Sequence, residues 1–322
     1  MLPLSDSERQ AVLDRPVIQA KQPSRTYWAR RDYFDPALDF LDYQNNTGSR
    51  SKIRRWSSLR LGSQQPLRWK GTALRFWLEQ GEQVISRPDP PKHLSPEYQA
   101  GEIRFHWRPR WRGQSFPDDA LEVGYLGHRT RSETVTQLKQ GGVTLTAAPG
   151  TALFRSSARD RGWLLAVRHR STLSCDWVLY FGAEYRDMTI ESRTLSHDRL
   201  VTALLAAQQI PQSTPWKEKQ VVLNLSADWS IRPTWQIAFD LEHFHINRHD
   251  YLPRKGFVDY DHNMTLDGYL FWSPNHSWRF FVQGHASQHF VLGDKPFLYN
   301  RRNNHTFRHP FGLLSFGVQY QG

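Results

Sequence analysis

Apolar and polar residues alternate with a period of two along several stretches of the chain. The clearest stretch runs from Val221 to Ile231, where every second residue is apolar and most of the residues between are polar. After Arg232-Pro233-Thr234 the alternation resumes from Trp235 to Glu242. Because successive side chains of a β-strand point to opposite faces, this pattern predicts an antiparallel hairpin with one apolar face.

The same unit recurs at three other places. Alternating segments flank the tight turns expected at 113–117, 171–174 and 273–276. Trp272 and Trp278 stand on either side of the last of these turns. The pattern therefore predicts four hairpins built on one plan.

Short and long connections alternate along the chain. The long ones, at 79–100, 187–216, 247–261 and 289–311, are polar and rich in Pro, Asn, Arg or His. Such alternation favours an up-and-down meander with short turns at one rim and long loops at the other. A soluble β-sandwich also has loops of unequal length, but this strict alternation is not expected of it.

The number of strands follows from counting alternating segments. These lie at 53–62, 67–78, 102–111, 119–128, 134–147, 151–157, 162–170, 176–190, 217–231, 235–246, 262–272, 277–288 and 312–321. We expect a further strand within 25–45, which gives about 14 strands within a range of about 12 to 16. The segments at 53–78 and 131–157 alternate poorly, and one of their pieces is open to interpretation as a bulged strand or an inward-folded loop.

The first residues follow a different pattern. Ser5-Asp6-Ser7-Glu8 resembles a helix start, and apolar residues follow at Ala11, Val12 and Leu13. We expect 1–24 to form a short helical or extended segment outside the sheet, and 25–322 to form the sheet itself.

Composition narrows the class of protein. Hydrophobic residues make up only 39% of the 322 residues, aromatic residues make up 13%, and the mean hydropathy is −0.66. No apolar run approaches the length that a transmembrane helix needs. A strand that faces lipid on one side and water on the other needs an apolar residue only at every second position, so a membrane strand stays compatible with these values.

Cysteine and charge each limit the chemistry. The single cysteine, Cys175, excludes an intramolecular disulfide and a cysteine-based zinc site, and we expect no metal and no cofactor.

The formal net charge of +11 favours an anionic partner, and nucleic acid, lipid head groups and acidic polymers all qualify. Basic residues are dispersed and no RNA-binding motif occurs, so we expect no nucleic acid partner.

The last segment, LLSFGVQYQG, resembles the C-terminal β-signal by which bacterial outer-membrane β-barrels are recognised for assembly. Ser315, Gly317 and Tyr320 carry the resemblance. The usual terminal Phe is missing, because the chain closes on Gln321-Gly322. The general resemblance is to outer-membrane barrels of the porin or polysaccharide-export type, and it covers about 50–322. It does not identify a subfamily.

This resemblance implies an all-β, antiparallel, up-and-down transmembrane β-barrel in the outer membrane of a Gram-negative bacterium. It implies outer-membrane lipid, lipopolysaccharide and the barrel-assembly machinery as partners, and a periplasmic place for 1–24. Residues 1–6 have neither the basic nor the apolar region of a signal peptide. We therefore expect a signal sequence or a preceding domain outside this sequence.

Tryptophans beside the turns suggest the aromatic girdle that membrane barrels carry at their interfaces. The predicted girdle consists of Trp107, Trp163, Trp177, Trp229, Trp235, Trp272 and Trp278.

The residues that alternate with the apolar ones along each predicted strand would face the inside of the barrel, and many of them are charged. The candidate lumen and substrate-path residues are Arg104, His106, Arg108, Arg168, Arg170, Arg186, Arg279, Asp240, Glu242 and Asp267, with Glu102, Glu184, Asp228, Gln283 and His285 on the same face. One interpretation is that these charges form salt-bridge ladders between neighbouring strands. The other is that the arginines create an electropositive lumen that favours anions.

From the resemblance and these charges we expect a pore or export conduit for a polar, anionic solute or polysaccharide, working with periplasmic export components, and not an enzyme. One alternative is an outer-membrane lipid-modifying hydrolase, for which His285 and Ser287 share a face as in a His-x-Ser element. Another is a soluble all-β protein that binds carbohydrate or nucleic acid. The segment Glu242-His243-Phe244-His245, with His249 nearby, suggests a metal site because residues two apart on a strand share a face. We prefer to interpret these histidines as interfacial polar groups at a strand end.

Overall fold

A computed structural model describes most of the chain. The described residues are 27–34, 52–69, 71–88, 91–94, 97–111, 114–115, 118–135, 137–140, 143–148, 153–196, 198–207, 213–249, 261–288 and 311–321. The helix predicted in 1–24 lies outside these residues. So does most of the loop predicted at 289–311.

The described part of the chain is almost entirely β-structure, with a main sheet of 13 antiparallel strands. These strands are β1 (Tyr27–Phe34), β2 (Lys52–Pro66), β3 (Thr72–Pro88), β4 (Pro91–Leu94), β5 (Glu97–Trp107), β8 (Asp119–Val135), β11 (Phe154–Thr172), β12 (Trp177–Leu195), β13 (Ser213–Arg232), β14 (Trp235–His249), β15 (His262–Trp272), β16 (Trp278–Ser287) and β17 (Phe311–Gln321). The antiparallel up-and-down sheet predicted from the alternation is confirmed. The total strand number of about 14 stays a prediction.

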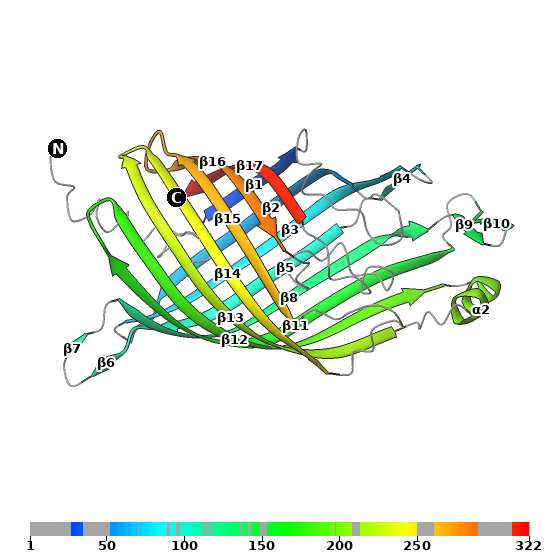
Figure 1. Cartoon of the computed structure of the whole chain (residues 1–322), viewed down its shortest axis with the longest axis horizontal. Coiled ribbons are helices and arrows are strands. Elements are labelled where there is room, and N and C mark those ends of the chain that lie inside the picture. Colours follow the sequence, from blue (N-terminus) through cyan, green and yellow to red (C-terminus); the bar gives the residue numbers. More distant parts are fainter. Residues whose placement is uncertain are drawn as a thin grey trace.

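Strand order follows the chain. From β8 to β17 each long strand of the main sheet pairs with the next, and β5 joins β3 to β8. β1 pairs with β17 on one side and with β2 on the other, and β2 also pairs with β3. Figure 1 shows the long strands tilted and wrapped around a common interior.

The remaining described elements lie at the two ends of the sheet (Figure 1). Between β5 and β8, β6 (Arg110–Trp111) and β7 (Gln114–Ser115) form a small hairpin at one rim. At the opposite rim lie β9 (Gln137–Gln140), β10 (Val143–Thr146) and the helix α2 (Arg199–Ala207). The Asp198 carboxylate caps this helix by accepting hydrogen bonds from the backbone N–H groups of Leu200 and Val201. No described helix has the length and apolar character needed to cross a membrane.

The two rims differ in the length of their connections. Tight turns at 67–71, 173–176, 233–234 and 273–277 lie at the rim of the β6–β7 hairpin, which we call the short-turn rim. The connections at the other rim, which we call the long-loop rim, are longer in most cases. The predicted alternation of short and long connections is therefore present among the described strands.

The two faces of the sheet have a reversed burial pattern. Apolar side chains on the outer face of β13 are exposed, as at Leu223 (53%) and Leu225 (41%). The polar side chains between them are buried against the interior, as at Asn224 (8%) and Asp228 (1%). β11 and β12 show the same alternation, with Leu165 and Phe181 exposed. A water-soluble sheet buries its apolar face instead.

Some predicted boundaries are wrong. The strand predicted at 134–147 is a separate two-stranded hairpin of β9 and β10, following the last residues of β8. The two segments predicted at 151–157 and 162–170 are not separate strands, because residues 154–157 and 162–170 belong to one strand, β11. The prediction failed because outer-face positions of β11 such as Arg159 and Arg161 are charged, and the apolar alternation therefore stops before the strand does.

The long connections are also shorter than predicted, for the same reason. β3, β12 and β14 extend into the predicted loops at 79–100, 187–216 and 247–261. On the outer face of β12, Asp187, Thr189 and Arg193 replace the apolar residues found lower on the strand. Hydrogen-bonded pairing thus continues beyond the apolar band.

Candidate functional site

A connected group of buried charges covers one wall of the interior. It contains Arg75, Arg104, Arg168, Arg186, Glu102, Glu122, Glu184 and His106, and we call it the arginine network. These residues come from β3, β5, β8, β11 and β12, which are successive neighbours in the sheet.

Glu122 is the centre of this network. Its Oε1 accepts from Arg75 Nη1 at 2.9 Å and lies 3.1 Å from His106 Nδ1. Its Oε2 accepts from Arg104 Nη1 at 3.0 Å and from Arg168 Nε at 3.1 Å. One carboxylate therefore connects four strands.

Glu184 forms the second node. Arg104 Nη1 and Arg168 Nη2 donate to its Oε2 at 2.8 and 2.9 Å, and Arg186 Nε donates to its Oε1 at 2.6 Å. Arg104 also pairs with Glu102 on its own strand. Arg104 and Arg168 thus each bridge Glu122 and Glu184, which holds the two carboxylates in one array.

The strand register explains why these groups meet. His106 lies directly opposite Glu122, and Arg104 lies opposite Gly124, which has no side chain to block it. Across β11, Ala166 lies opposite both Glu122 and Glu184 and leaves room for the long side chains above it. Small residues at these interior positions let arginines from neighbouring strands reach the carboxylates.

The network supports the ladder interpretation of the interior charges. The side chains of Glu122 and Glu184 are only 1% and 2% exposed, and each arginine side chain is no more than 14% exposed. Removing one partner from such an array leaves a buried charge uncompensated. The network therefore ties the strands of this wall together and also places guanidinium groups along the interior.

A second polar group lies on the opposite wall. Asp267 Oδ1 accepts from Gln283 Nε2 at 2.7 Å and lies 2.8 Å from His285 Nδ1. Ser226 donates to Asp240, and Glu242 is half-buried on the interior face of β14. Charges of both signs line the interior, as the alternation predicts.

Other predicted interior residues lie near the short-turn rim. Arg170 pairs with Asp118 at 3.0 Å, and the backbone N–H of Arg108 donates to the carbonyl of Gly71 at 2.7 Å. The Arg279 guanidinium lies 5.2 Å from the centre of the Phe271 ring. These residues do not join the arginine network, and a role for any of the candidates in passage of a substrate stays a prediction.

Arg75 and Glu122 were not predicted, although the network depends on them. Glu122 lies between Leu121 and Val123, so the alternation alone would have placed it inside. Arg75 was missed because the interior face of β3 also carries Trp77, which hides the alternation in that segment.

The predicted girdle tryptophans lie on strand ends or on the outer face. Trp177 stacks on Trp229 with 5.3 Å between ring centres, and Trp235 stacks on Trp272 at 6.3 Å. Trp107, Trp177, Trp229, Trp235, Trp272 and Trp278 all lie near the short-turn rim. Trp163 differs, because it lies at the middle of β11, where it is 64% exposed and contacts Tyr125.

The residues of the predicted assembly signal lie in β17. Ser315 and Gly317 are opposite Gln283 and Phe281 of β16, and the Tyr320 ring packs against Trp278 at 5.1 Å. Their recognition by assembly machinery stays a prediction.

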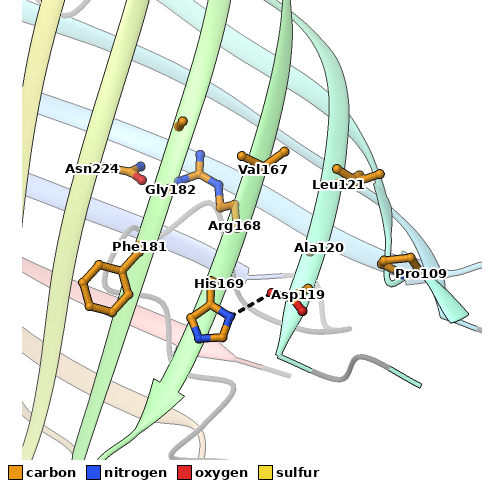
Figure 2. Close-up of a pocket in the computed structure, with 11 residues that line it drawn as sticks. Pro109, Asp119, Ala120, Leu121, Val167, Arg168, His169, Phe181, Gly182 and Asn224 are labelled. Atoms are coloured by element: carbon orange, nitrogen blue, oxygen red, sulfur yellow. Dashed lines mark hydrogen bonds and ion pairs between the residues drawn. The ribbon is translucent and has the colours of Figure 1, made fainter. Parts of the chain in front are cut away.

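A pocket of about 560 Å³ lies along β8, β11 and β12, close to the short-turn rim (Figure 2). Arg168, Gly182 and Asn224 line it from the interior face, while Val167 and Phe181 line it from the outer face. Because residues of both faces line it, this pocket is not a cavity of the polar interior alone. The arginine network is the stronger candidate site.

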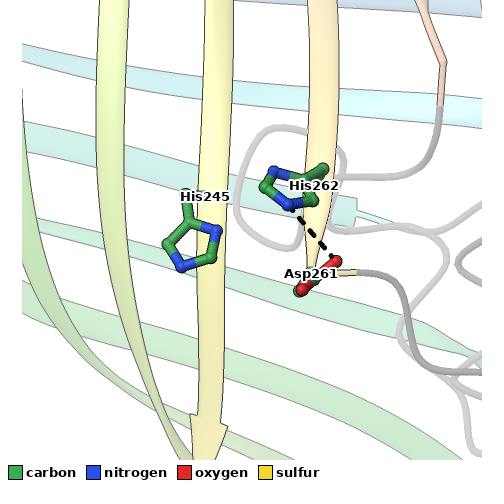
Figure 3. Close-up of side chains that lie close together, drawn as sticks. All are labelled: His245, Asp261 and His262. Atoms are coloured by element: carbon green, nitrogen blue, oxygen red, sulfur yellow. Dashed lines mark ion pairs between the residues drawn. The ribbon is translucent and has the colours of Figure 1, made fainter.

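Histidines gather on the outer face of β14 and β15. Figure 3 shows the side chains of His245, Asp261 and His262 close together. Their ligand atoms lie within 4.8 Å of one another. His243 shares this face and stacks on His262, whereas Glu242 points to the other face. The predicted spacing therefore brings two histidines of β14 to one face but does not bring Glu242 to them.

No family model matches the sequence, and no curated protein sequence matches it significantly. Solved structures do. The beta domain of the Bordetella autotransporter Brka aligns with a TM-score of 0.52 at 12% identity, covering 93% of this chain and 100% of that one. The translocator domain of the autotransporter NalP from Neisseria meningitidis aligns with a TM-score of 0.50 at 8% identity, covering 98% and 94%. The chain therefore has the fold of bacterial outer-membrane β-barrels.

Proposed function

We propose that this chain is an integral outer-membrane protein whose sheet closes into a barrel and forms a passage for a polar solute. The reversed burial of its two faces is the observation that carries the proposal. An outer face with exposed residues such as Leu165, Leu223 and Phe239 is costly in water, whereas hydrocarbon solvates it.

The pairing pattern supports closure. A spanning sheet cannot leave an open edge in lipid, because unpaired backbone groups cannot find hydrogen bonds there. The pairing of β1 with both β2 and β17, together with the pairing of β2 with β3, provides partners at both ends of the strand order.

The height of the apolar band supports membrane insertion. On the outer face of β12, apolar and aromatic residues extend from Trp177 to Tyr185. This stretch rises about 25 Å along the strand at about 3.3 Å per residue, and a tilt of about 40° reduces its height to about 20 Å. A membrane barrel carries an apolar band about 25 Å tall.

The short-turn rim would face the periplasm and the long-loop rim would face the outside of the cell. Lipid, lipopolysaccharide and the assembly machinery would be partners.

The cargo we propose is a polar solute, and in its finer form an anionic solute or polysaccharide. The net charge of +11 and the interior arginines support this choice. Carboxylates pair with the four arginines of the network, so we expect the preference for anions to be modest.

A lipid-modifying hydrolase is the second candidate. The contact of Asp267 with His285 would orient a general base, and Ser287 lies two residues further along the same strand face. His285 and Ser287 both belong to the polar interior face, however, and the Ser287 Oγ accepts a hydrogen bond from Asn263 at 3.4 Å. A lipid substrate would lie at the apolar outer face, which favours the passage over the hydrolase.

The first experiment combines localisation with conductance. The outer-membrane fraction is extracted with detergent, and boiled and unboiled samples are compared on a denaturing gel. A shift on boiling, followed by ion conductance in a planar bilayer, is the expected result. The reversal potential in a salt gradient then measures anion preference. A freely soluble protein without a heat shift would contradict the membrane assignment, and an inserted barrel without conductance would contradict the passage.

A further inference from the structure

Basic side chains gather on the outer face directly above the apolar band. Arg129 and Arg131 extend from β8, Arg159 and Arg161 from β11, and Lys217 and Lys219 from β13. All six side chains are exposed, while the residues between them, such as Asp160 and Glu218, are buried on the interior side. We call this group the outer basic surface.

The position of this surface follows from the strands. Each residue lies in the half of its strand next to the long-loop rim. On β11, Arg161 is the next outer-face residue above Trp163, which is followed by the exposed Leu165. The basic side chains thus begin where the apolar band ends.

Two of these arginines form a like-charged cross-strand pair. Arg129 and Arg159 lie directly opposite each other in the β8–β11 register. Like charges at opposite positions of a sheet repel. Two acidic residues also lie opposite members of this surface, Glu191 opposite Arg159 and Glu97 opposite Arg131. Glu191 forms its ion pair with Arg193, and among the described residues no carboxylate lies within ion-pair distance of the Arg129 or Arg159 guanidinium. A phosphate between the two guanidiniums would remove the repulsion and accept paired hydrogen bonds from them.

We propose that the outer basic surface binds the phosphate groups of lipid A, the lipid portion of lipopolysaccharide, in the outer leaflet. This inference rests on the proposed function, because the long-loop rim must face outward. Lipid A carries phosphates at the junction between its acyl chains and its sugars. Arg161 and Trp163 meet at the corresponding junction of the protein surface.

The test compares lipid A with its dephosphorylated form. The intact barrel, in detergent micelles, is mixed with each lipid, and bound copies are counted by native mass spectrometry. The triple variant Arg129→Gln, Arg159→Gln, Arg161→Gln should lose at least about fivefold in retention of the phosphorylated lipid, because three charge-assisted contacts disappear. The double variant Arg68→Gln, Arg232→Gln is the control, since both arginines are exposed at the short-turn rim and should not change retention.

Heat-shifted migration of every variant shows that each barrel has folded. Equal retention by the wild type and the triple variant, or equal binding of the dephosphorylated lipid, would overturn the proposal. In that case the barrel and its conductance would still stand. Failure of the wild type itself to form a heat-modifiable barrel would contradict both the lipid A site and the proposed function.

A separate observation concerns the histidines of β14 and β15. His245 and His262 lie directly opposite each other across the two strands, and Asp261 precedes His262. The backbone N–H of Ile246 donates to the Asp261 carbonyl at 2.7 Å, which fixes the start of the strand. All three side chains are exposed, and His262 Nε2 lies 3.6 Å from Asp261 Oδ1.

We infer that these three residues bind a divalent transition-metal ion such as Zn²⁺. Tetrahedral ligands about 2.1 Å from zinc lie about 3.4 Å apart, so small rotations of exposed side chains would bring this group into place. Imidazole ligands suit Zn²⁺, Ni²⁺ and Cu²⁺. A fourth position would remain open to water or to an outside ligand.

Isothermal titration of the detergent-solubilised barrel with zinc chloride tests this site. We expect one ion per chain and a loss of at least about tenfold in affinity for His262→Ala, because one of three ligands is removed. His169→Ala is the matched control, since His169 is also exposed and contacts a single carboxylate, Asp119, at 2.8 Å on the opposite rim. Equal affinity of the wild type and His262→Ala would contradict the site.

Discussion

Leu223 and Asn224 are neighbours in β13, yet the apolar side chain is 53% exposed and the polar one only 8%. This relationship distinguishes a membrane strand from a soluble one. In lipid, Leu223→Arg should destabilise the barrel by about 2–4 kcal/mol, because a charge near the middle of the apolar band faces hydrocarbon. Urea unfolding in phospholipid vesicles measures the change.

Leu223→Ala serves as the control for lost side-chain volume and should cost much less. In a soluble sheet, an arginine in place of a half-exposed leucine would leave stability unchanged or raise it. A neutral effect of Leu223→Arg would therefore contradict insertion in a bilayer.

The second prediction concerns the centre of the arginine network. Glu122→Gln removes the charge that faces Arg75, Arg104 and Arg168, and should lower stability by about 3–5 kcal/mol because buried guanidiniums lose their counter-charge. Thermal loss of the heat-shifted band on a denaturing gel gives the comparison.

Glu191→Gln is the matched control for Glu122→Gln. Glu191 also pairs with an arginine, Arg193, but this pair lies exposed on the outer face of the same sheet. Exposed pairs contribute little, so no measurable change is expected. Similar effects of the two substitutions would mean that the network does not hold the wall together.

The third prediction concerns Gly182, on the interior face of β12. A Cβ at this position would lie 2.1 Å from Asn224 Oδ1 and 3.2 Å from Arg168 Nη1. Gly182→Ala should therefore displace both side chains and cost about 1–3 kcal/mol. At Gly284 a Cβ would meet no atom within 4 Å, so Gly284→Ala should fold as the wild type does in the same urea titration. Equal stability of the two variants would contradict the packing around Gly182.

The fourth prediction concerns the β9–β10 hairpin. Its two strands pair only with each other among the described elements and lie at the long-loop rim. Replacement of Gln137–Thr146 by a short Gly-Ser linker should leave the heat shift and the conductance unchanged, because flexible surface loops tolerate such changes at little cost. Loss of the heat shift in this variant would show that the hairpin supports the sheet.

Alternation predicted the strands best where both faces meet uniform surroundings. The hairpin of Val221–Ile231 and Trp235–Glu242, with its turn at Arg232-Pro233-Thr234, lies within β13 and β14. There the outer positions are all apolar and the interior positions are mostly polar, so period two is visible in the residue types.

The prediction failed where the strands pass beyond the apolar band. On β11, Arg159 and Arg161 occupy outer positions, and Asp160 between them is an interior residue. Three consecutive charged residues look like a loop in the sequence, although they are paired strand in the structure. Hydrophobic periodicity reports the solvent on each side of a strand, and it cannot report pairing that continues between two polar environments.

The arginine network could be predicted only in part. Parity placed Arg104, His106, Arg168 and Arg186 on the interior face, where the structure has them. It could not show that Glu122 would contact three of these side chains, Arg104, His106 and Arg168, together with Arg75, because that depends on the register of strands β3 to β11. Register across a sheet is set by three-dimensional packing and is not readable from one strand at a time.

The pairing of β1 with β17 joins the two strands that lie furthest apart in the sequence. Most other pairs in the main sheet join strands that follow each other closely along the chain, so they can form locally and early. The β1–β17 pair has the highest loop-closure cost and must wait until the rest of the sheet is in place. Until then the nascent protein would expose two hydrogen-bonding edges, each able to recruit a strand from another molecule. The rate at which this seam forms would decide between a folded protein and an aggregate, so substitutions in the short β1 should affect biogenesis more than the stability of molecules that have already matured.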